Sequence, residues 1–330
     1  MIIRLGQILK PIMRDFGRSE LTFRRDRFIV DHIFPRIQRM GDFPGVFRSS
    51  IKLPNCTADV FHPVNHNPGR YILFNHGGAF CFALKPSYIR TASMIADLTK
   101  SLVVLPDYRL APDCPYPAAI DDCRDALHWF ESQGITRKDI VLVGDSAGGN
   151  IALNLAQEAV EVGSLVLISP WLDLSCSSAE WDLNISDHFV HKTPAKRAAW
   201  LYGNGNKDWT YGESNPQAVA EFDSMVKDPS VSPIYGDMTF SSTSPVLIQV
   251  SGSERMLGDA LMLWHRLSSE RIVIDSNAET AVRRWSSGGH KLSVWPNEPH
   301  VWQILKPGGK TGRAALQEIC DHVCTSYHVS

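Results

Sequence analysis

Short, unbroken apolar runs alternate with amphipathic stretches through most of the 330-residue chain, and this alternation narrows its fold more than any other feature. The apolar runs are typical of buried strands and lie at 71–76, 101–107, 140–146, 164–170, 245–252 and 291–296. Stretches with helical spacing lie between several of them, at 87–100, 118–134 and 148–160. Strands that are apolar along their whole length are buried on both faces, so the pattern predicts a mostly parallel sheet with helices on both sides.

Two regions fall outside this alternation. Residues 1–48 are charged and have a helical pattern, and residues 171–240 combine several Trp and Tyr residues with polar turn residues. We expect both regions to cover the C-terminal edge of the sheet, where open α/β folds bind ligands, although the aromatic residues equally fit plain packing. The expected organisation is an N-terminal helical cap segment, 1–48, and a main domain, 49–330, with a cap insertion at about 171–240.

Composition excludes several classes of protein. A formal net charge of −2 gives no field that would attract nucleic acid or an anionic membrane. No stretch reaches the roughly 18 apolar residues of a spanning helix, and Arg4 and Pro11 interrupt the apolar N-terminus where a signal peptide would be continuous. Seven cysteines, an odd number in no metal-ligand spacing, are typical of a reducing compartment. We therefore expect a cytoplasmic protein with no integral membrane segment and no metal site.

A candidate nucleophile follows the strand at 140–146. The residues Gly144-Asp145-Ser146-Ala147-Gly148 form a G-x-S-x-G pattern between a predicted strand and a predicted helix. In that context the glycines permit a sharp turn that exposes the Ser146 hydroxyl at the sheet edge. The helix that begins there directs N–H groups toward developing negative charge. The pattern predicts a nucleophile elbow.

A second glycine-rich segment, "FNHGGAF" at 74–80, follows another predicted strand. Acyl transfer needs N–H donors close to the oxygen of a tetrahedral intermediate, and backbone without bulky side chains can approach that oxygen. We expect the amides of Gly77, Gly78 and Ala147 to form this oxyanion hole.

The motifs together resemble the hormone-sensitive-lipase-like branch of the α/β-hydrolases, over about residues 50–325. They are "HGGAF", "DYRLAPDCPYPAAIDD", "GDSAGGN", "SPWLDL", "SPIYGD" and "EPHVWQ", in this order. The resemblance implies an eight-stranded α/β-hydrolase sheet, a helical cap, no cofactor and hydrolysis of carboxylic esters. It also implies that Ser146 is the nucleophile and that His76 is a structural partner beside the oxyanion hole. Ala79 replaces the third glycine of the usual H-G-G-G run, and Asp113 stands where the family commonly has glutamate.

Serine needs a general base, and the order of the triad in this fold places the base near the C-terminus. His300 follows the predicted strand at 291–296 and matches the family's histidine. His290 lies at the other end of that strand, and His322 and His328 lie in or after the terminal helix. The sequence therefore favours His300.

The acid is less clearly marked, because Ser-Glu-Arg occurs twice, at 253–255 and at 269–271. Glu254 lies four residues beyond Val250, as the family's acid does, whereas Glu270 precedes residues 271–285, which have the expected loop-to-helix pattern. A catalytic acid needs a short, rigid connection to a strand end. We therefore predict Glu254 as the acid, with Glu270 as the alternative and Asp259 behind both.

The doubled tripeptide suggests that residues 255–270 are an extra segment. If these residues are deleted, the sequence before 255 joins the sequence after 270 and resembles the family without a gap. Two origins stay open at this point, a retained intron in the gene model and a genuine insertion. The second is supported by the helical spacing of Leu257, Ala260, Leu261, Trp264 and Leu267.

These residues favour a serine hydrolase that cleaves small-molecule carboxylic esters of small or medium acyl chains through an acyl-enzyme intermediate. Its expected partners include no nucleic acid, and a homodimer is compatible with the sequence. Two other functions stay open. An amide or lactone hydrolase of the kynurenine-formamidase-like type uses the same triad. A catalytically silent ligand-binding homologue would resemble the gibberellin receptors, which have lost the catalytic histidine.

Overall fold

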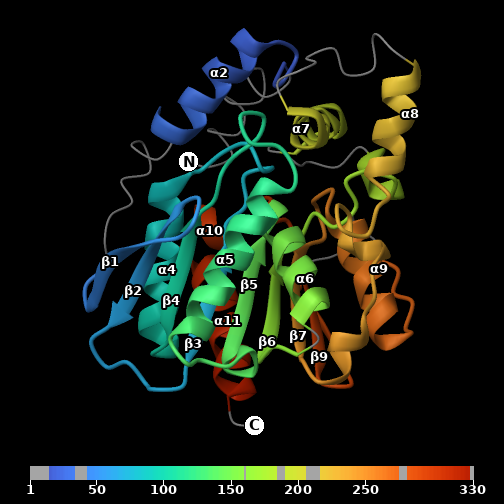
Figure 1. The fold of residues 1–330 in the computed structure, drawn as a ribbon. Coiled ribbons are helices and arrows are strands. Elements are labelled where there is room, and N and C mark those ends of the chain that lie inside the picture. Colours follow the sequence, from blue (N-terminus) through green and yellow to red (C-terminus); the bar gives the residue numbers. More distant parts are fainter. Residues whose placement is uncertain are drawn as a thin grey trace.

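The computed structural model describes residues 15–33, 43–159, 161–183, 190–205, 216–274 and 281–327, and these form one nine-stranded sheet flanked by helices (Figure 1). Neighbouring strands from β3 and β4 through β9 are parallel, while β1, β2 and β8 pair antiparallel at the two ends. Across the sheet the order is β1 (Val46–Lys52), β2 (Thr57–Pro63), β4 (Leu102–Asp107), β3 (Tyr71–Asn75), β5 (Ile140–Asp145), β6 (Ser164–Ile168), β7 (Val246–Ser251), β9 (His290–Trp295) and β8 (Arg283–Ser287). The predicted mostly parallel sheet is confirmed.

The sheet has nine strands instead of the expected eight. The additional edge strand β8 forms a hairpin with β9 through Gly288 and Gly289, both of which have positive φ and so permit the tight turn. Residues 283–285 are thus strand, where a loop-to-helix pattern had been expected. Their alternation explains the difference, because Trp285 packs on the core while Arg284 forms an ion pair with Glu318 at 2.6 Å.

Helices cover both faces of the sheet (Figure 1). One face packs against α4 (Lys85–Thr99), α10 (Trp302–Leu305) and α11 (Lys310–Ser326), and the other against α5 (Ala118–Ser132), α6 (Ala147–Ala159) and α9 (Leu257–Ser268). A short 3₁₀ turn, η2 (Arg137–Asp139), leads into β5, whose residues are all buried. The interpretation of the unbroken apolar runs as doubly covered strands is confirmed, as are the three predicted helices.

The remaining helices lie beyond the C-terminal ends of the parallel strands (Figure 1). They are α2 (Glu20–Phe28), the π-helical turn η1 (Ile29–Ile33), α7 (Lys192–Asn204) and α8 (Pro216–Met225), with the 3₁₀ turn η3 (Ala179–Trp181) between β6 and α7. Two further 3₁₀ turns, η5 (Pro233–Tyr235) and η6 (Thr239–Ser242), lie between α8 and β7 and pack alongside α6, where Gln157 donates to Pro233 O. Ser19 caps α2 through its hydroxyl, which accepts the N–H of Thr22. The helical pattern of residues 1–14 lies outside the described residues, and β1 begins within the segment 1–48.

Residues 255–270 contain α9, the helix between the parallel strands β7 and β9. Leu257, Ala260 and Trp264 are buried in the core, while Leu261 and Leu267 are half-buried against it. The helical spacing predicted for this segment is confirmed. Two adjacent parallel strands need a crossover that packs on the sheet, and α9 is that packed helix among the described residues. The segment is therefore part of the hydrophobic core.

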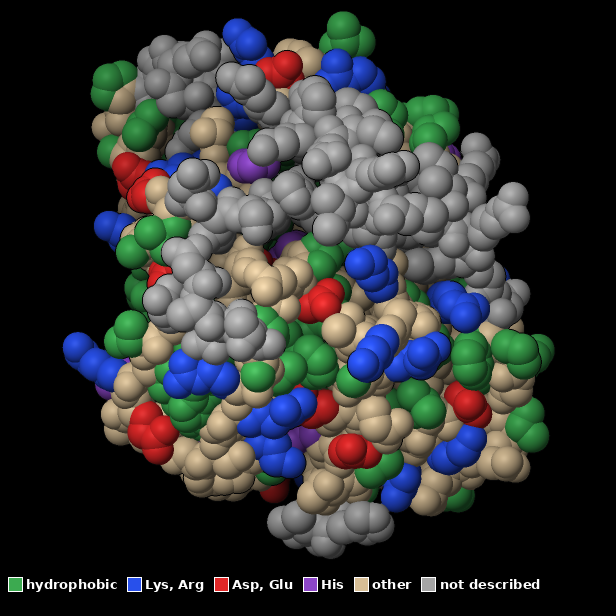
Figure 2. Space-filling view, turned by 180° about the vertical axis from the view of Figure 1, so that it is seen from behind, with side chains coloured by type: hydrophobic (Ala, Val, Ile, Leu, Met, Phe, Trp, Pro, Cys, Tyr) green, Lys and Arg blue, Asp and Glu red, His purple; other side chains and the backbone are tan. Residues whose placement is uncertain are grey.

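On the face of the molecule seen in Figure 2, acidic and basic side chains are interspersed. Among the helices that the structure describes, none is both long enough and apolar enough to cross a membrane.

The burial of Trp264 predicts that α9 is required for stability. Trp264→Ala should lower the free energy of unfolding by about 3–5 kcal/mol, because it leaves a large cavity where the indole is fully buried. Val273→Ala is the matched control, since Val273 is 88% exposed. Urea denaturation of both variants measures the difference. Equal stability of the two would show that the segment does not contribute to the core.

Candidate active site

Ser146 lies at the sharp turn between β5 and α6, as the sequence predicted. Its φ is +52°, a strained value that the surrounding backbone maintains: Ser146 N donates to Ile168 O at 2.9 Å, and its carbonyl accepts from Trp171 N at 3.0 Å. A Cβ at Gly148 would overlap the carbonyl oxygen of Asn75 at the end of β3, the strand beside β5 in the sheet. Glycine at this position therefore allows α6 to begin against the end of β3.

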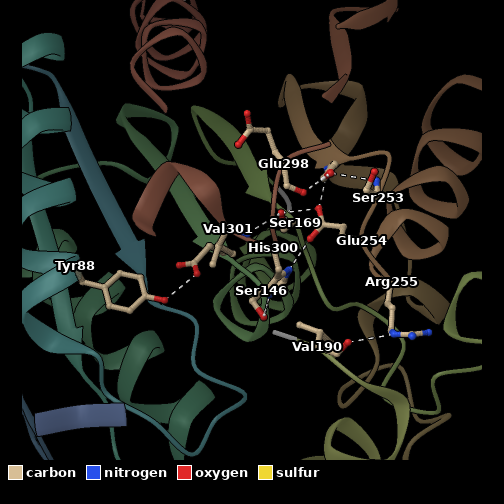
Figure 3. Close-up of polar contacts among 12 residues, drawn as sticks. Tyr88, Ser146, Ser169, Val190, Ser253, Glu254, Arg255, Glu298, His300 and Val301 are labelled. Carbon is tan, nitrogen blue, oxygen red and sulfur yellow. Dashed lines mark hydrogen bonds and ion pairs between the residues drawn. The ribbon is translucent and has the colours of Figure 1, made fainter. Parts of the chain in front are cut away.

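A hydrogen-bonded chain joins Ser146 to a histidine and a carboxylate (Figure 3). His300 Nε2 lies 3.0 Å from Ser146 Oγ, and His300 Nδ1 lies 2.6 Å from Glu254 Oε2. All three residues are almost fully buried. Because an ionised carboxylate only accepts hydrogen bonds, Nδ1 carries the proton and Nε2 is left to accept from the serine hydroxyl.

The other candidate acids lie elsewhere. Glu270 is exposed just beyond α9, where its N–H bonds the Ser268 hydroxyl. Asp259 Oδ2 accepts the N–H groups of Leu172 and Asp173, at 2.7 and 2.9 Å, and so holds the loop after β6. The structure therefore brings Glu254 to His300, and neither Glu270 nor Asp259.

The other candidate bases have structural partners. His290 Nδ1 accepts from Val246 N at 3.2 Å. His322 Nε2 lies 2.7 Å from Ser164 Oγ, whose own proton goes to Pro245 O, and burial lowers the His322 pKa to about 4. His328 lies outside the described residues.

The geometry around Gly77 differs from the expectation. Gly77 N donates to Asp145 Oδ1 at 3.0 Å and lies 3.0 Å from the Tyr88 hydroxyl, which itself donates to Asp145 Oδ2 at 2.8 Å. An N–H already engaged by a buried carboxyl group is not available to a substrate oxygen, and this contact argues against Gly77 as an oxyanion donor. The N–H groups of Gly78 and Ala79 have no partner among the described residues.

The third expected donor, Ala147, is the first residue of α6. The N–H groups in the first turn of a helix have no intrahelical acceptor and lie at the positive end of its dipole. This amide therefore remains a candidate donor beside Ser146.

His76 stabilises the glycine loop, residues 77–79. Its Nδ1 donates to Gly77 O at 2.7 Å, and its ring stacks on Tyr108 with centroids 4.0 Å apart. Burial lowers the His76 pKa to about 4, so the ring is neutral at physiological pH. Burial also raises the pKa of Asp145 to about 7, against the hydrogen bonds from Tyr88 and Gly77. The motif letters included Asp145 but no role for it, and nothing in the sequence pointed to Tyr88.

A small cavity of about 70 Å³ opens beside Ser146. It is lined by Ser146, Ala79 and His191 together with apolar side chains from the N-terminal segment, the loops after β3 and β6, α7 and the residue before α9, among them Phe16, Phe82, Trp171, Ala195, Ala198 and Met256. A larger groove of about 300 Å³ lies between α2 and residues 112–113 and includes none of the candidate residues. Within the described ranges, no three His, Cys, Asp or Glu side chains are grouped as a metal ion would require.

With this geometry established, the comparisons identify the family. The chain belongs to the α/β-hydrolase fold family, whose signature matches residues 72–294. Carboxylesterase/phospholipase LipF of Mycobacterium tuberculosis is 31% identical over 294 residues, which cover 86% of this chain and 70% of LipF.

Solved structures share the fold over nearly the whole chain. A mutant of the esterase E40 has a TM-score of 0.72 at 25% identity and covers 92% of this chain and 91% of its own. An esterase from the bacterial hormone-sensitive lipase family has a TM-score of 0.74 at 24% identity and covers 98% of each chain. The fold expected from the resemblance to the hormone-sensitive-lipase-like branch is therefore confirmed.

Asp259 predicts a pH dependence of stability. Burial raises the pKa of its carboxyl group to about 8, above that of a free carboxyl, so the folded protein binds this proton more tightly than the unfolded chain. Its contribution to stability is therefore present at low pH and lost as the pH rises through about 8. Asp259→Asn should flatten the fall in Tm between about pH 5 and pH 8, which lies between the unfolded and the folded pKa of this group.

Asp237→Asn is the control, because the pKa of that exposed carboxyl is lowered by hydrogen bonds from Thr239. It should leave the slope unchanged over the same interval. Identical Tm slopes for the wild-type protein and the Asp259 variant, measured by calorimetry, would contradict the prediction.

Proposed function

We propose that this protein is a serine hydrolase that cleaves carboxylic esters of small or medium acyl chains through an acyl-enzyme intermediate. The observation that carries the proposal is the continuous hydrogen-bonded chain from Ser146 Oγ through His300 to Glu254. Membership of the α/β-hydrolase family and the similarity to LipF, a carboxylesterase, support ester hydrolysis. In this proposal Ser146 is the nucleophile, His300 the general base and Glu254 the acid.

Acylation begins with transfer of the Ser146 proton to His300 Nε2 while Oγ bonds to the ester carbonyl carbon. The imidazolium that forms lies against Glu254, whose negative charge stabilises it and whose hydrogen bond holds the required tautomer. Burial of all three groups strengthens these interactions, since little water screens them.

The oxygen of the tetrahedral intermediate needs donors on the side of Ser146 away from the base. The amides of Gly78, Ala79 and Ala147 are the proposed set, because Gly77 is engaged by Asp145. Ala79 has a φ of +53°, so this loop holds its amides in a conformation that a regular strand does not offer. Pre-organised donors of this kind need no rearrangement during the reaction.

The intermediate collapses when the imidazolium of His300 protonates the leaving alcohol oxygen and the carbon–oxygen bond to that alcohol breaks. The acyl group remains on Ser146 Oγ. A water molecule then loses a proton to His300 and attacks the acyl carbon, which releases the carboxylic acid and returns the proton to Ser146. One ester and one water give one acid and one alcohol.

The size of the cavity beside Ser146 limits the length of the acyl chain. At about 70 Å³ it is far below the 300–1,000 Å³ that is typical of sites for drug-sized ligands. Its lining includes Ser146 and His191 and is otherwise apolar. A short acyl chain fits this position, and an apolar wall favours it over a charged one.

The nucleophile is tested with Ser146→Ala. We expect turnover of p-nitrophenyl esters to fall by a factor of about 10⁴–10⁶, because the covalent step is lost. The wild-type enzyme should prefer acetyl and butyryl over palmitoyl esters, and a serine-directed phosphonate should add to Ser146 in peptide mass spectra. Unchanged ester hydrolysis by the variant, together with an unmodified Ser146, would remove the basis of the mechanism.

The two glutamates of the repeated tripeptide provide a matched pair. Glu254→Gln should lower kcat by about 10⁴, because Gln can present its NH₂ to His300 Nδ1 and so favour the wrong tautomer. Glu270→Gln should retain nearly full activity, since that side chain is exposed beyond α9. Steady-state kinetics of the two purified variants decides, and a larger loss for Glu270→Gln would overturn the choice of acid.

A further inference from the structure

We propose that Ser169 is a positioning residue for Glu254 and a fourth member of the hydrogen-bonded chain, an inference that rests on the proposed function. Ser169 is the residue immediately after β6 and is completely buried. Its hydroxyl donates to Glu254 Oε1 at 2.7 Å, and Oε1 is the oxygen that does not face His300 (Figure 3).

Glu254 needs such a partner because of its length. A glutamate has one more rotatable bond than an aspartate, so more rotamer freedom is lost when it is held in one orientation. In this protein Oε1 is held from two neighbouring strand ends: Ser169 Oγ beyond β6 and Ser251 N at the end of β7, each at 2.7 Å. The carboxylate is thus oriented on one side so that its other oxygen meets His300.

The same hydroxyl also reaches the segment that carries the base. Val301 N donates to Ser169 Oγ at 3.4 Å, and Val301 is the residue next to His300. A serine hydroxyl has one proton and two lone pairs, so it can donate to the carboxylate and accept from this amide at once. Ser169 therefore links the acid loop and the histidine loop, which are 46 residues apart along the chain.

The backbone of Ser169 supports a role for its side chain. Its φ is +45°, in the left-handed region where a residue with a Cβ is strained and glycine is not. Its N–H bonds Gln249 O at 2.7 Å, which helps to hold this conformation. Because serine occupies this strained position and its hydroxyl contacts Glu254, we infer that the side chain of Ser169 has a functional role.

Ser164 offers a matched control on the same strand. It is also buried, and its hydroxyl also contacts an ionisable side chain, in this case His322, at 2.7 Å. That contact lies at the opposite end of β6 from Ser169, and Ser164 is bonded neither to Glu254 nor to Ser146. Loss of the Ser164 hydroxyl therefore reports the effect of removing a buried serine–histidine contact without touching the proposed triad.

The experiment is a double-mutant cycle on the full-length protein. Ser169→Gly and Ser169→Ala are each made in the wild-type background and in the Glu254→Ala background, and kcat and KM are measured with a p-nitrophenyl ester. In the wild-type background kcat should fall about 10-fold with KM unchanged, the lower end for a hydrogen bond to a charged group, because Ser251 N still holds Oε1.

In the Glu254→Ala background there is no carboxylate to orient, so the same substitutions should change kcat less than about 2-fold. A merely structural role would give the same loss in both backgrounds, and that result would overturn the inference. Unchanged kcat for Ser169→Gly in the wild-type background would overturn it as well. Glycine fits the backbone conformation, so this variant carries the test if Ser169→Ala does not fold.

Ser164→Ala should lower Tm while kcat stays within about 2-fold of wild type, as expected when only a structural hydrogen bond is removed. The Ser146→Ala variant distinguishes a failure of the proposed function from a failure of the role proposed for Ser169. If it retains ester hydrolysis, the proposed function itself fails. If it is inactive while Ser169→Gly is fully active, only the role of Ser169 fails.

Discussion

The close approach of two backbone segments at Gly148 is the constraint on which the site depends. The absence of a side chain there lets α6 begin directly against the end of β3, and Gly144 allows the same turn to close on itself. These contacts hold Ser146 in a strained conformation and place the first amide of α6 beside the glycine loop at 77–79. The nucleophile and its candidate oxyanion donors are therefore brought together by main-chain packing, which is more rigid than side-chain contacts.

Around this elbow, hydrogen bonds stabilise two buried carboxyl groups. Glu254 is ringed by His300, Ser169 and Ser251, whereas Asp145 is held by Tyr88 and Gly77. Burying an ionised group is unfavourable unless it is paired, and the raised pKa of Asp145 shows that its burial is only partly compensated. That carboxyl group nevertheless anchors the start of the glycine loop. Stability and positioning thus depend on the same buried side chains.

Residues 255–270 connect the proposed acid to the rest of the molecule. Arg255 donates to the carbonyl group of Val190 at 3.1 Å (Figure 3) and to that of Trp181 at 2.6 Å. It thereby ties the insertion between β6 and β7 to the residue after Glu254. Met256 lines the cavity beside Ser146, and α9 packs into the core. Residues 255–270 are therefore integrated with the core, the cavity wall and the insertion between β6 and β7.

Periodicity and motif order were sufficient to predict the parallel strands, three of the flanking helices, the elbow at Ser146 and the pairing of His300 with a glutamate near the end of β7. Each of these depends on a pattern within a few residues or on the order of elements along the chain. The ninth strand, the engagement of Gly77 by Asp145 and Tyr88, and the contact of Ser169 with Glu254 were not evident from the sequence. β8 is a local hairpin with β9, but its short alternating run stands where a loop-to-helix pattern was expected. The contacts of Gly77 with Asp145 and of Ser169 with Glu254 join residues that are 68 and 85 positions apart along the chain. The direction in which one amide or hydroxyl points is decided only when the folded chain brings its partner within hydrogen-bonding distance.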